Sequence, residues 1–434
     1  MKIAVLGLWH LGTVTACGAA HSGHFVTGWD RNPDAVTALM QGQPPLFEPG
    51  LAAQLLSCLA NGTLSFTSDL TQALKDAEVI WITHDTPVDD RDVADCESVL
   101  SDVRSAIPLA DPGAVILISS QLPAGTARQL LSFCRSIGRS DLEVAVSPEN
   151  LRLGQALAVF SNPDRVVCGV YSEKAKKTLT QLWTKITDRI EWMGVESAEM
   201  TKHAINAFLA TSVCFANELA ALCEVVGADA KEVERGLKSE SRIGPGAYLG
   251  PGPAYAGGTL ARDLTFLTDM GRRAHRSPLV MEAAMASNDR HKNWAIDRLA
   301  ELLQVNGVKE IKGKKVALWG LAYKPGTDTL RRSSSLETAK KITDLGALVI
   351  AHDPAIKSLP APWKDFIGLA SEALEAIEGA EALVICTSWP NYLSISADDI
   401  ISRMSRPLIL DPAGFLRPVL GNHQGLEYVT ICYR

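Results

Sequence analysis

Short apolar runs rich in β-branched residues recur through the first 170 residues, separated by longer stretches of mixed polarity. Each run has the length of a buried strand, and most intervening stretches are long enough for a crossover helix. This rhythm predicts a doubly wound parallel sheet. The predicted strands are KIAVLGL at 2–8, HFVTGWD at 24–30, EVIWITH at 78–84, AVILISS at 114–120, LEVAVSP at 142–148 and RVVCGV at 165–170.

The middle of the chain follows a helical pattern instead. Residues 197–226 contain neither glycine nor proline and predict one long helix, and residues 278–305 predict a second. The strand rhythm then returns, with predicted strands KKVALWGLAY at 314–323, ALVIAHDP at 347–354, ALVICTSW at 382–389 and RPLILDPAG at 406–414. We therefore predict an α/β protein with a Rossmann-like domain at 1–196, a central helical domain at 197–310 and a second Rossmann-like domain at 311–434.

The turn after the first predicted strand carries residues of a dinucleotide site. It reads GLWHLG from Gly7 to Gly12, so that Trp9 stands where the G-x-G-x-x-G pattern has its second glycine. Asp30 ends the second predicted strand, where a carboxylate accepts hydrogen bonds from ribose hydroxyls and repels a 2′-phosphate. The pattern favours NAD over NADP, although Arg31 follows directly. The alternative is an α/β domain whose crevice no longer accepts a dinucleotide.

A run rich in glycine and proline, YLGPGPAYAGGTLARDL, extends from Tyr248 to Leu264. It predicts a tight loop that a ligand can approach closely, followed by a helix that begins at Leu264. The run resembles the loop YLxPGxGFGGSCFPKD of the UDP-glucose/GDP-mannose dehydrogenase family, which carries the catalytic cysteine. Aligned without a gap, the cysteine of that family falls on Thr259, its lysine on Arg262 and its aspartate on Asp263.

The resemblance implies a reaction in which a sugar C6 alcohol is oxidised in two hydride transfers, with the cysteine capturing the intermediate aldehyde. A threonine hydroxyl is a far weaker acid than a thiol and needs an adjacent base to attack a carbonyl. Two other motifs also depart from the family. In SQLPAG, Gln121 replaces a threonine that positions the hydrolytic water, and SPENLRLG keeps Glu149 but has Leu153 for a second glutamate. Together these changes predict an altered or shortened reaction.

Residues of the first oxidation step are retained. Lys202 and Asn206 are four positions apart in TKHAINAFLA and therefore share one face of the predicted helix. The pair matches the family and resembles the wider 6-phosphogluconate and β-hydroxyacid dehydrogenase group. By that resemblance, Lys202 assists proton removal from the alcohol. The alternative is a solvated lysine without a catalytic role.

Other motifs of the family assign ligand contacts only by resemblance. GLAYKPGTDTLRRSSSL resembles GLAYKPNTDDxRESPSL, and SRIGPGAYL resembles xRIGxxFL, whose arginine reaches the sugar nucleotide from a neighbouring subunit. DPAGFL places Ala413 where the family has an arginine. The further cofactor residues implied are Thr86, Gln121 and Arg331, and the substrate residues are Tyr248, Leu249, Gly257, Arg242 and Lys324. These assignments imply a nucleotide-sugar substrate and a homodimer whose central domain carries the active site.

Composition and charge limit the classes of binding partner that we expect. A formal net charge of -7 and a pI near 5.8 argue against nucleic acid or an anionic membrane as the main partner. The nine cysteines form no CxxC pair or Cys/His cluster, so we expect no metal site and reduced thiols in a cytoplasmic protein. We also expect no signal peptide and no transmembrane span.

The leading hypothesis is an NAD-dependent oxidoreductase that removes one hydride from a nucleotide-linked sugar. Lys202 would be the base, Asn206 and Asp263 would hold the reacting hydroxyl or a water, and Thr259 would line the pocket without forming an adduct. Three alternatives stay open: a full UDP-sugar 6-dehydrogenase without covalent capture, an NAD-dependent epimerase, and a catalytically silent binder of nucleotide sugar or cofactor.

Overall fold

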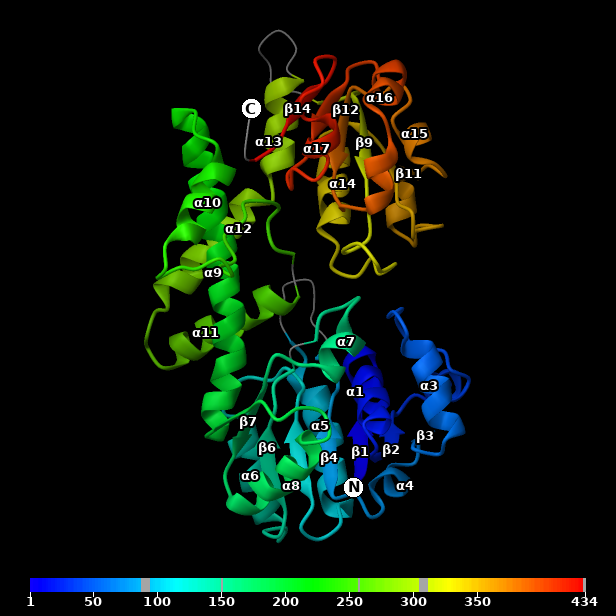
Figure 1. Cartoon of the computed structure of the whole chain (residues 1–434), viewed down its shortest axis with the longest axis vertical. Helices are drawn as coiled ribbons and strands as arrows, with labels where there is room; N and C mark the ends of the chain where they lie inside the picture. Colours follow the sequence, from blue (N-terminus) through cyan, green and yellow to red (C-terminus); the bar gives the residue numbers. More distant parts are fainter. Residues whose placement is uncertain (87–93, 150, 257, 304–310, 432–434) are drawn as a thin grey trace. The chain divides into compact units, whose positions relative to one another are not determined.

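The computed structural model of the chain describes residues 1–86, 94–149, 151–256, 258–303 and 311–431. The chain separates into two compact units, Met1–Ile205 and Asn206–Arg434. Figure 1 shows a sheet with flanking helices in the first unit, and a helical region followed by a second sheet in the second unit.

The first unit contains an eight-stranded sheet in the order β3-β2-β1-β4-β5-β6-β7-β8. All neighbouring pairs are parallel except β6 and β7, which are antiparallel. This antiparallel pair departs from the all-parallel prediction, and such strands are common beside the edge of parallel sheets. The strands are β1 (Lys2–Leu6), β2 (Phe25–Trp29), β3 (Leu64–Thr67), β4 (Val79–Ile82), β5 (Val115–Ile118), β6 (Glu143–Val146), β7 (Val166–Val170) and β8 (Ile190–Met193).

Helices cover both faces of this sheet, which explains its nearly continuous apolar strands. On β1, Ile3 and Val5 belong to the core formed with α1, α3 and α8, whereas Ala4 and Leu6 belong to the core formed with α4, α5 and α6. The helices of this unit are α1 (His10–His21), α2 (Pro33–Met40), α3 (Leu51–Ala60), α4 (Leu70–Leu74), α5 (Cys96–Ala106), α6 (Thr126–Ser136), α7 (Ala156–Ser161) and α8 (Glu173–Trp183).

Helix α9 (Val195–Val226) confirms the long predicted helix. It ends where Gly227 adopts a left-handed conformation with φ of 72°. Among the described helices, α9 alone has the length and hydropathy to cross a bilayer, and 39% of that stretch is buried against the rest of the chain.

The helices after α9 differ from the predictions in two places. Helix α11 begins at Thr259 rather than Leu264, because Gly258, with φ of 100°, forms the turn that starts it. The predicted helix at 278–305 is interrupted at Asn293, a weak helix former whose side-chain oxygen accepts a hydrogen bond from Lys341 at 2.8 Å. Its C-terminal end lies outside the described residues. The observed helices are α10 (Ala230–Ser239), α11 (Thr259–Arg273), α12 (Leu279–His291) and α13 (Trp294–Leu302).

The second sheet has six parallel strands in the order β11-β10-β9-β12-β13-β14. Val316 and Leu318 of β9 belong to the core formed with α13 and α14, and Ala317 and Trp319 belong to the core formed with α15 and α16. The elements are β9 (Lys315–Trp319), β10 (Leu348–His352), β11 (Ile367–Leu369), β12 (Ala382–Ile385), β13 (Leu408–Leu410), β14 (Glu427–Val429), α14 (Ser334–Asp344), α15 (Ala373–Ala376), α16 (Ala397–Arg403) and α17 (Arg417–Leu420). The predicted fold class is thus confirmed, and the four strands that the sequence did not predict, β3, β8, β11 and β14, are the sheet edges.

The two sheets have the same kind of turn at the end of their first strand. Gly7 after β1 and Gly320 after β9 have φ of 90° and 95°. The carboxylate that follows the second strand, Asp30 or Asp353, then accepts backbone N–H groups of that turn. Asp353 is only 2% exposed, whereas Asp30 is partly exposed.

A buried carboxylate on α9 caps helix α6. Glu199 Oε2 accepts the N–H of Gly125 at 2.7 Å, and Oε1 accepts that of Ala127 at 3.0 Å. Gly125 offers no side chain of its own at the N-terminus of α6. Burial raises the pKa of Glu199 above its usual range, although these two hydrogen bonds oppose the shift. Glu199 therefore fixes the loop before α6 to α9.

We predict that Glu199→Ala lowers the free energy of unfolding by about 1–3 kcal/mol, because it leaves the buried N–H of Ala127 and the half-buried N–H of Gly125 without this acceptor. Urea denaturation followed by circular dichroism measures the loss. Glu196→Ala is the matched control, since Glu196 also joins α9 to α6 but through an exposed ion pair with Arg128. Equal losses in the two variants would contradict the capping role.

Candidate active site

Two glycines after β1 have no space for a side chain: Gly7 in the turn between β1 and α1, and Gly12 in the first turn of α1. A Cβ on Gly7 would lie 2.6 Å from Cγ of His84, and a Cβ on Gly12 would lie 1.7 Å from the carbonyl oxygen of Gly7. Trp9 has an ordinary backbone conformation with φ of -69°, so this position does not require glycine, and its side chain is 42% exposed. Since no side chain caps α1, its N-terminus can face a phosphate group.

Asp30 is fixed at this turn. Its Oδ2 accepts the N–H of Leu8 at 2.9 Å, and its Oδ1 accepts the N–H of Asn32 at 2.9 Å. An ionised carboxylate has about four acceptor positions, so room remains for a ribose hydroxyl. The glycine turn, the uncapped helix and this carboxylate together fit the adenosine half of NAD.

Thr86 and Gln121 follow the ends of the neighbouring strands β4 and β5. The Thr86 hydroxyl donates to the carbonyl oxygen of Gln121 at 2.7 Å and is buried. This hydrogen bond joins the two loops at the carboxyl edge of the sheet, the edge at which ligands of such sheets bind.

Lys202 and Glu149 meet in the first unit. Lys202 Nζ donates to the carbonyl oxygen of Glu149 at 2.8 Å and lies 3.2 Å from its carboxylate Oε1. Both line a cavity of about 30 Å³ together with Ser120, Gln121 and Glu199. The Ser120 hydroxyl is buried without a hydrogen-bond partner. A cavity of this size and polarity can hold a water molecule.

Asn206 and Asp263 meet in the second unit. The Asn206 amide donates a hydrogen bond to the Asp263 carboxylate, and both side chains are buried. Thr259 lies one helical turn before Asp263, at the start of α11, and its side chain is exposed. The structure thus brings together Lys202 with Glu149, and Asn206 with Asp263.

Three side chains that the sequence did not single out hold the glycine loop. Asn217 accepts the N–H of Gly252 at 2.8 Å, and the His291 ring contacts the Gly252 carbonyl oxygen at 2.9 Å. Asn288 both accepts from the N–H of Tyr255 at 2.9 Å and donates to its carbonyl oxygen at 3.0 Å. Burial lowers the pKa of His291 and so favours its neutral form. Of these three residues only Asn217 could have been noticed in the sequence, as an asparagine within an apolar stretch predicted to be helical.

The residues assigned to the substrate are more exposed. Tyr248 is 60% exposed, and Arg242 is exposed with its guanidinium paired to Glu240 at 2.9 Å. Leu249 and Lys324 are half-buried, the cofactor candidate Arg331 is exposed, and Gly257 lies outside the described residues. Within the described ranges, no three His, Cys, Asp or Glu side chains group closely enough to hold a metal ion.

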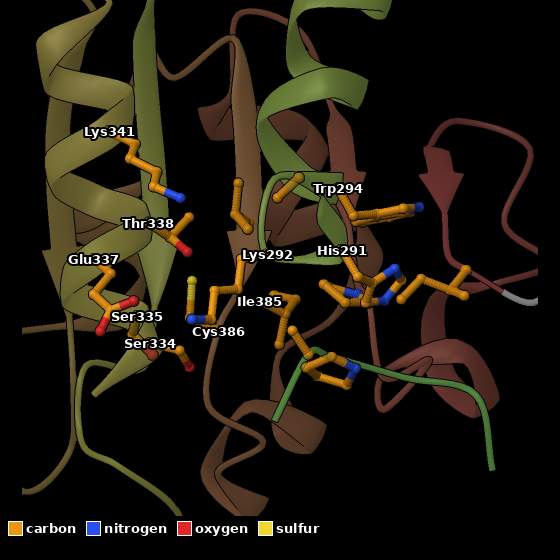
Figure 2. A pocket seen from close by; sticks show the side chains of 16 residues that line it. His291, Lys292, Trp294, Ser334, Ser335, Glu337, Thr338, Lys341, Ile385 and Cys386 are labelled. Atoms are coloured by element: carbon orange, nitrogen blue, oxygen red, sulfur yellow. The ribbon is translucent and has the colours of Figure 1, made fainter. Parts of the chain in front are cut away.

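A cavity of about 60 Å³ lies beside the glycine loop in the second unit. Figure 2 shows Glu337, Thr338 and Lys341 of α14 on one wall, facing His291 and Trp294. Pro253 and Ala254 of the loop also line it, whereas Tyr248, Leu249, Arg242 and Lys324 do not. The cavity therefore includes none of the described residues assigned to the substrate.

Comparisons with known proteins cover nearly the whole chain. Residues 1–187 match the NAD binding domain of the UDP-glucose/GDP-mannose dehydrogenase family, residues 196–290 its central domain and residues 317–418 its UDP binding domain. A UDP-glucose 6-dehydrogenase of Pseudomonas aeruginosa is 34% identical, over 99% of this chain and 97% of its own length. A UDP-glucose 6-dehydrogenase of Rhizobium meliloti is 32% identical, over 99% of both chains.

Solved structures agree with these matches. A UDP-glucose dehydrogenase from Pyrobaculum islandicum superposes with a TM-score of 0.89 at 28% identity, covering 100% of this chain and 98% of the other. A UDP-D-ManNAc dehydrogenase from Pyrococcus horikoshii gives a TM-score of 0.86 at 27% identity, covering 99% of both chains. The chain therefore belongs to the UDP-glucose/GDP-mannose dehydrogenase family, a family of NAD-dependent nucleotide-sugar dehydrogenases.

Proposed function

We propose that this dehydrogenase oxidises a nucleotide-linked sugar by a single hydride transfer, releasing an aldehyde or a ketone. The observation that carries the proposal is Thr259, which stands at the position of the family cysteine in a loop that keeps the YLxPG start and the final aspartate of the family. Gln121 and Leu153 add to it, because each replaces a residue that completes the second half of the family reaction.

The residues of the first step support this division. NAD, which the Gly7 turn and Asp30 would hold, would supply the acceptor for a hydride from the carbon that carries the alcohol. Lys202 would take the hydroxyl proton, while Glu149 holds its amine in place through two contacts. Asn206 and Asp263, fixed by their mutual hydrogen bond, would orient the reacting hydroxyl or a water. Thr259 would line the pocket and form no bond to the substrate.

UDP-glucose is the first substrate to test, because relatives at 34% and 32% identity are named UDP-glucose 6-dehydrogenases. Those names also favour the second candidate, a complete 6-dehydrogenase that oxidises the hydrated aldehyde without covalent capture.

We assign NAD binding to residues 1–196, the active site and the dimer contact to residues 197–310, and binding of the nucleotide sugar to residues 311–434. The eight described cysteines are free, which supports a cytoplasmic location.

We further propose a homodimer formed through α9. Phe208, Phe215 and Leu222 are spaced by seven residues and are 68%, 51% and 64% exposed. A seven-residue spacing places them in one stripe along the helix, and Val225 and Val226 continue the apolar surface. An exposed apolar stripe of this length fits the same stripe of a second copy across a twofold axis.

The number of hydrides is measured directly. Purified protein is incubated with NAD and each of a panel of nucleotide sugars, and NADH formed is compared with sugar consumed. We expect one equivalent of NADH per sugar. Two equivalents would support the complete 6-dehydrogenase. A changed sugar without NADH would support an epimerase. Tight binding of the sugar without any change would support a silent binder.

Substitutions at Lys202 and Thr259 distinguish a residue that transfers a proton from a residue that acts as a nucleophile. We expect Lys202→Ala to lose at least ~10²-fold in kcat, the scale for a positioned acid or base. Thr259→Ser and Thr259→Ala should keep appreciable single-hydride activity, with no sugar adduct in the intact mass. Thr259→Cys should at most accumulate a trapped thiohemiacetal or thioester. Covalent chemistry at Thr259 is indicated instead if wild type carries an adduct, or if Thr259→Ala is as inactive as Lys202→Ala.

The dimer proposal predicts that Phe215→Asp, in the middle of the stripe, yields a folded monomer by light scattering, because burying two new carboxylates in an apolar contact is costly. Met40→Asp is the control, since Met40 is similarly exposed at 59% but lies on α2 of the first unit. A monomeric wild type, or an unchanged mass for Phe215→Asp, would refute the contact.

A further inference from the structure

Arg31 directly follows Asp30, the carboxylate assigned to the cofactor ribose, and an ion-pair partner holds its guanidinium in place. Its guanidinium forms an ion pair with Asp102 and also contacts the carbonyl oxygen of Ser98 at 3.4 Å. Both partners belong to α5, the helix that follows β4. The arginine side chain remains 59% exposed, so this arrangement is set by its partner and not by burial.

Asp102 is itself fixed from two sides. Only 13% of its side chain is exposed, and its Oδ2 also pairs with His84 Nε2 at 3.0 Å. His84 is the residue packed against Gly7, so the same side chain joins the glycine turn to Asp102. Burial opposes ionisation of Asp102, but hydrogen bonds from His84 and Arg31 outweigh it and hold the pKa below its usual range. Asp102 is therefore a rigid anion.

The position of Arg31 matters because NAD and NADP differ only at the 2′ position of the adenosine ribose. A carboxylate at the end of the second strand binds the 2′-hydroxyl, and an arginine nearby can instead accommodate a 2′-phosphate. This chain has both residues side by side, Asp30 and Arg31. A guanidinium engaged with Asp102 cannot at the same time make a bidentate pair with a phosphate.

We propose that Asp102 sets the preference for NAD over NADP by holding Arg31 against α5, away from the 2′ position. Asp102 acts through Arg31 and is a positioning residue for cofactor selection. The inference rests on NAD binding to the first unit and is independent of how many hydrides the enzyme transfers.

The test measures binding without turnover. Dissociation constants for NADH and NADPH are determined by fluorescence titration of the intact protein in the absence of sugar. In Asp102→Asn the freed arginine should reduce the ratio of the NADPH to the NADH constant about tenfold, the scale of one charge-assisted hydrogen bond. Glu97→Gln is the matched control: it removes a carboxylate from the same helix whose partner is Arg104, and it should leave the ratio unchanged.

Two more variants distinguish an effect of the freed arginine on cofactor binding from an effect of removing the charge of Asp102. Arg31→Ala/Asp102→Asn should return the ratio to that of wild type, and Arg31→Ala alone should leave NADH binding within about twofold, because the held arginine makes no cofactor contact. Arg31→Ala, at an exposed site, keeps the test decisive even if Asp102→Asn does not fold. An unchanged ratio in Asp102→Asn, a gain that survives in the double variant, or a tenfold loss of NADH binding in Arg31→Ala would each overturn the proposal.

Discussion

The absence of a side chain at the end of the first strand is the constraint on which both α/β domains depend. At Gly7 the neighbouring residue His84 leaves no room for a Cβ, and at Gly320 a Cβ would lie 2.4 Å from Cβ of Thr387. The strand end can therefore pack directly on its neighbour while the chain turns sharply with positive φ. This turn brings a backbone N–H group within reach of the acid after the second strand in each sheet.

The candidate catalytic groups are held by polar contacts that leave them little freedom. Lys202 is fixed by Glu149, and Asn206 by Asp263. Positioning of this kind supports catalysis because small displacements of a reacting group reduce the rate strongly. Thr259 is different, since it is exposed at the first residue of α11. The contrast agrees with the role proposed for Thr259, which is to line the pocket without bonding to the substrate.

Sequence patterns predicted the buried strands of both sheets, because strands covered on two faces need continuous apolar runs. The edge strands, such as β11 (Ile367–Leu369) with only three residues, carry too little of this pattern to be recognised. The break at Asn293 and the start of α11 depend on contacts across space, which local propensity does not contain. The same holds for Asn217 and Asn288, whose role in holding the glycine loop follows from folding and not from spacing.

The burial of Asp353 has a consequence for how the two related sheets can evolve or be redesigned. Its carboxylate accepts hydrogen bonds from the N–H groups of Leu321, Ala322, Ala355 and Ile356 and from the Trp389 indole. These contacts saturate its acceptor positions, so a sugar hydroxyl finds no vacant one there. Similar topology therefore does not make the two domains interchangeable: grafting cofactor specificity onto the C-terminal sheet would first require dismantling a structural network, whereas the N-terminal acid remains open to adaptation by changes in its neighbours.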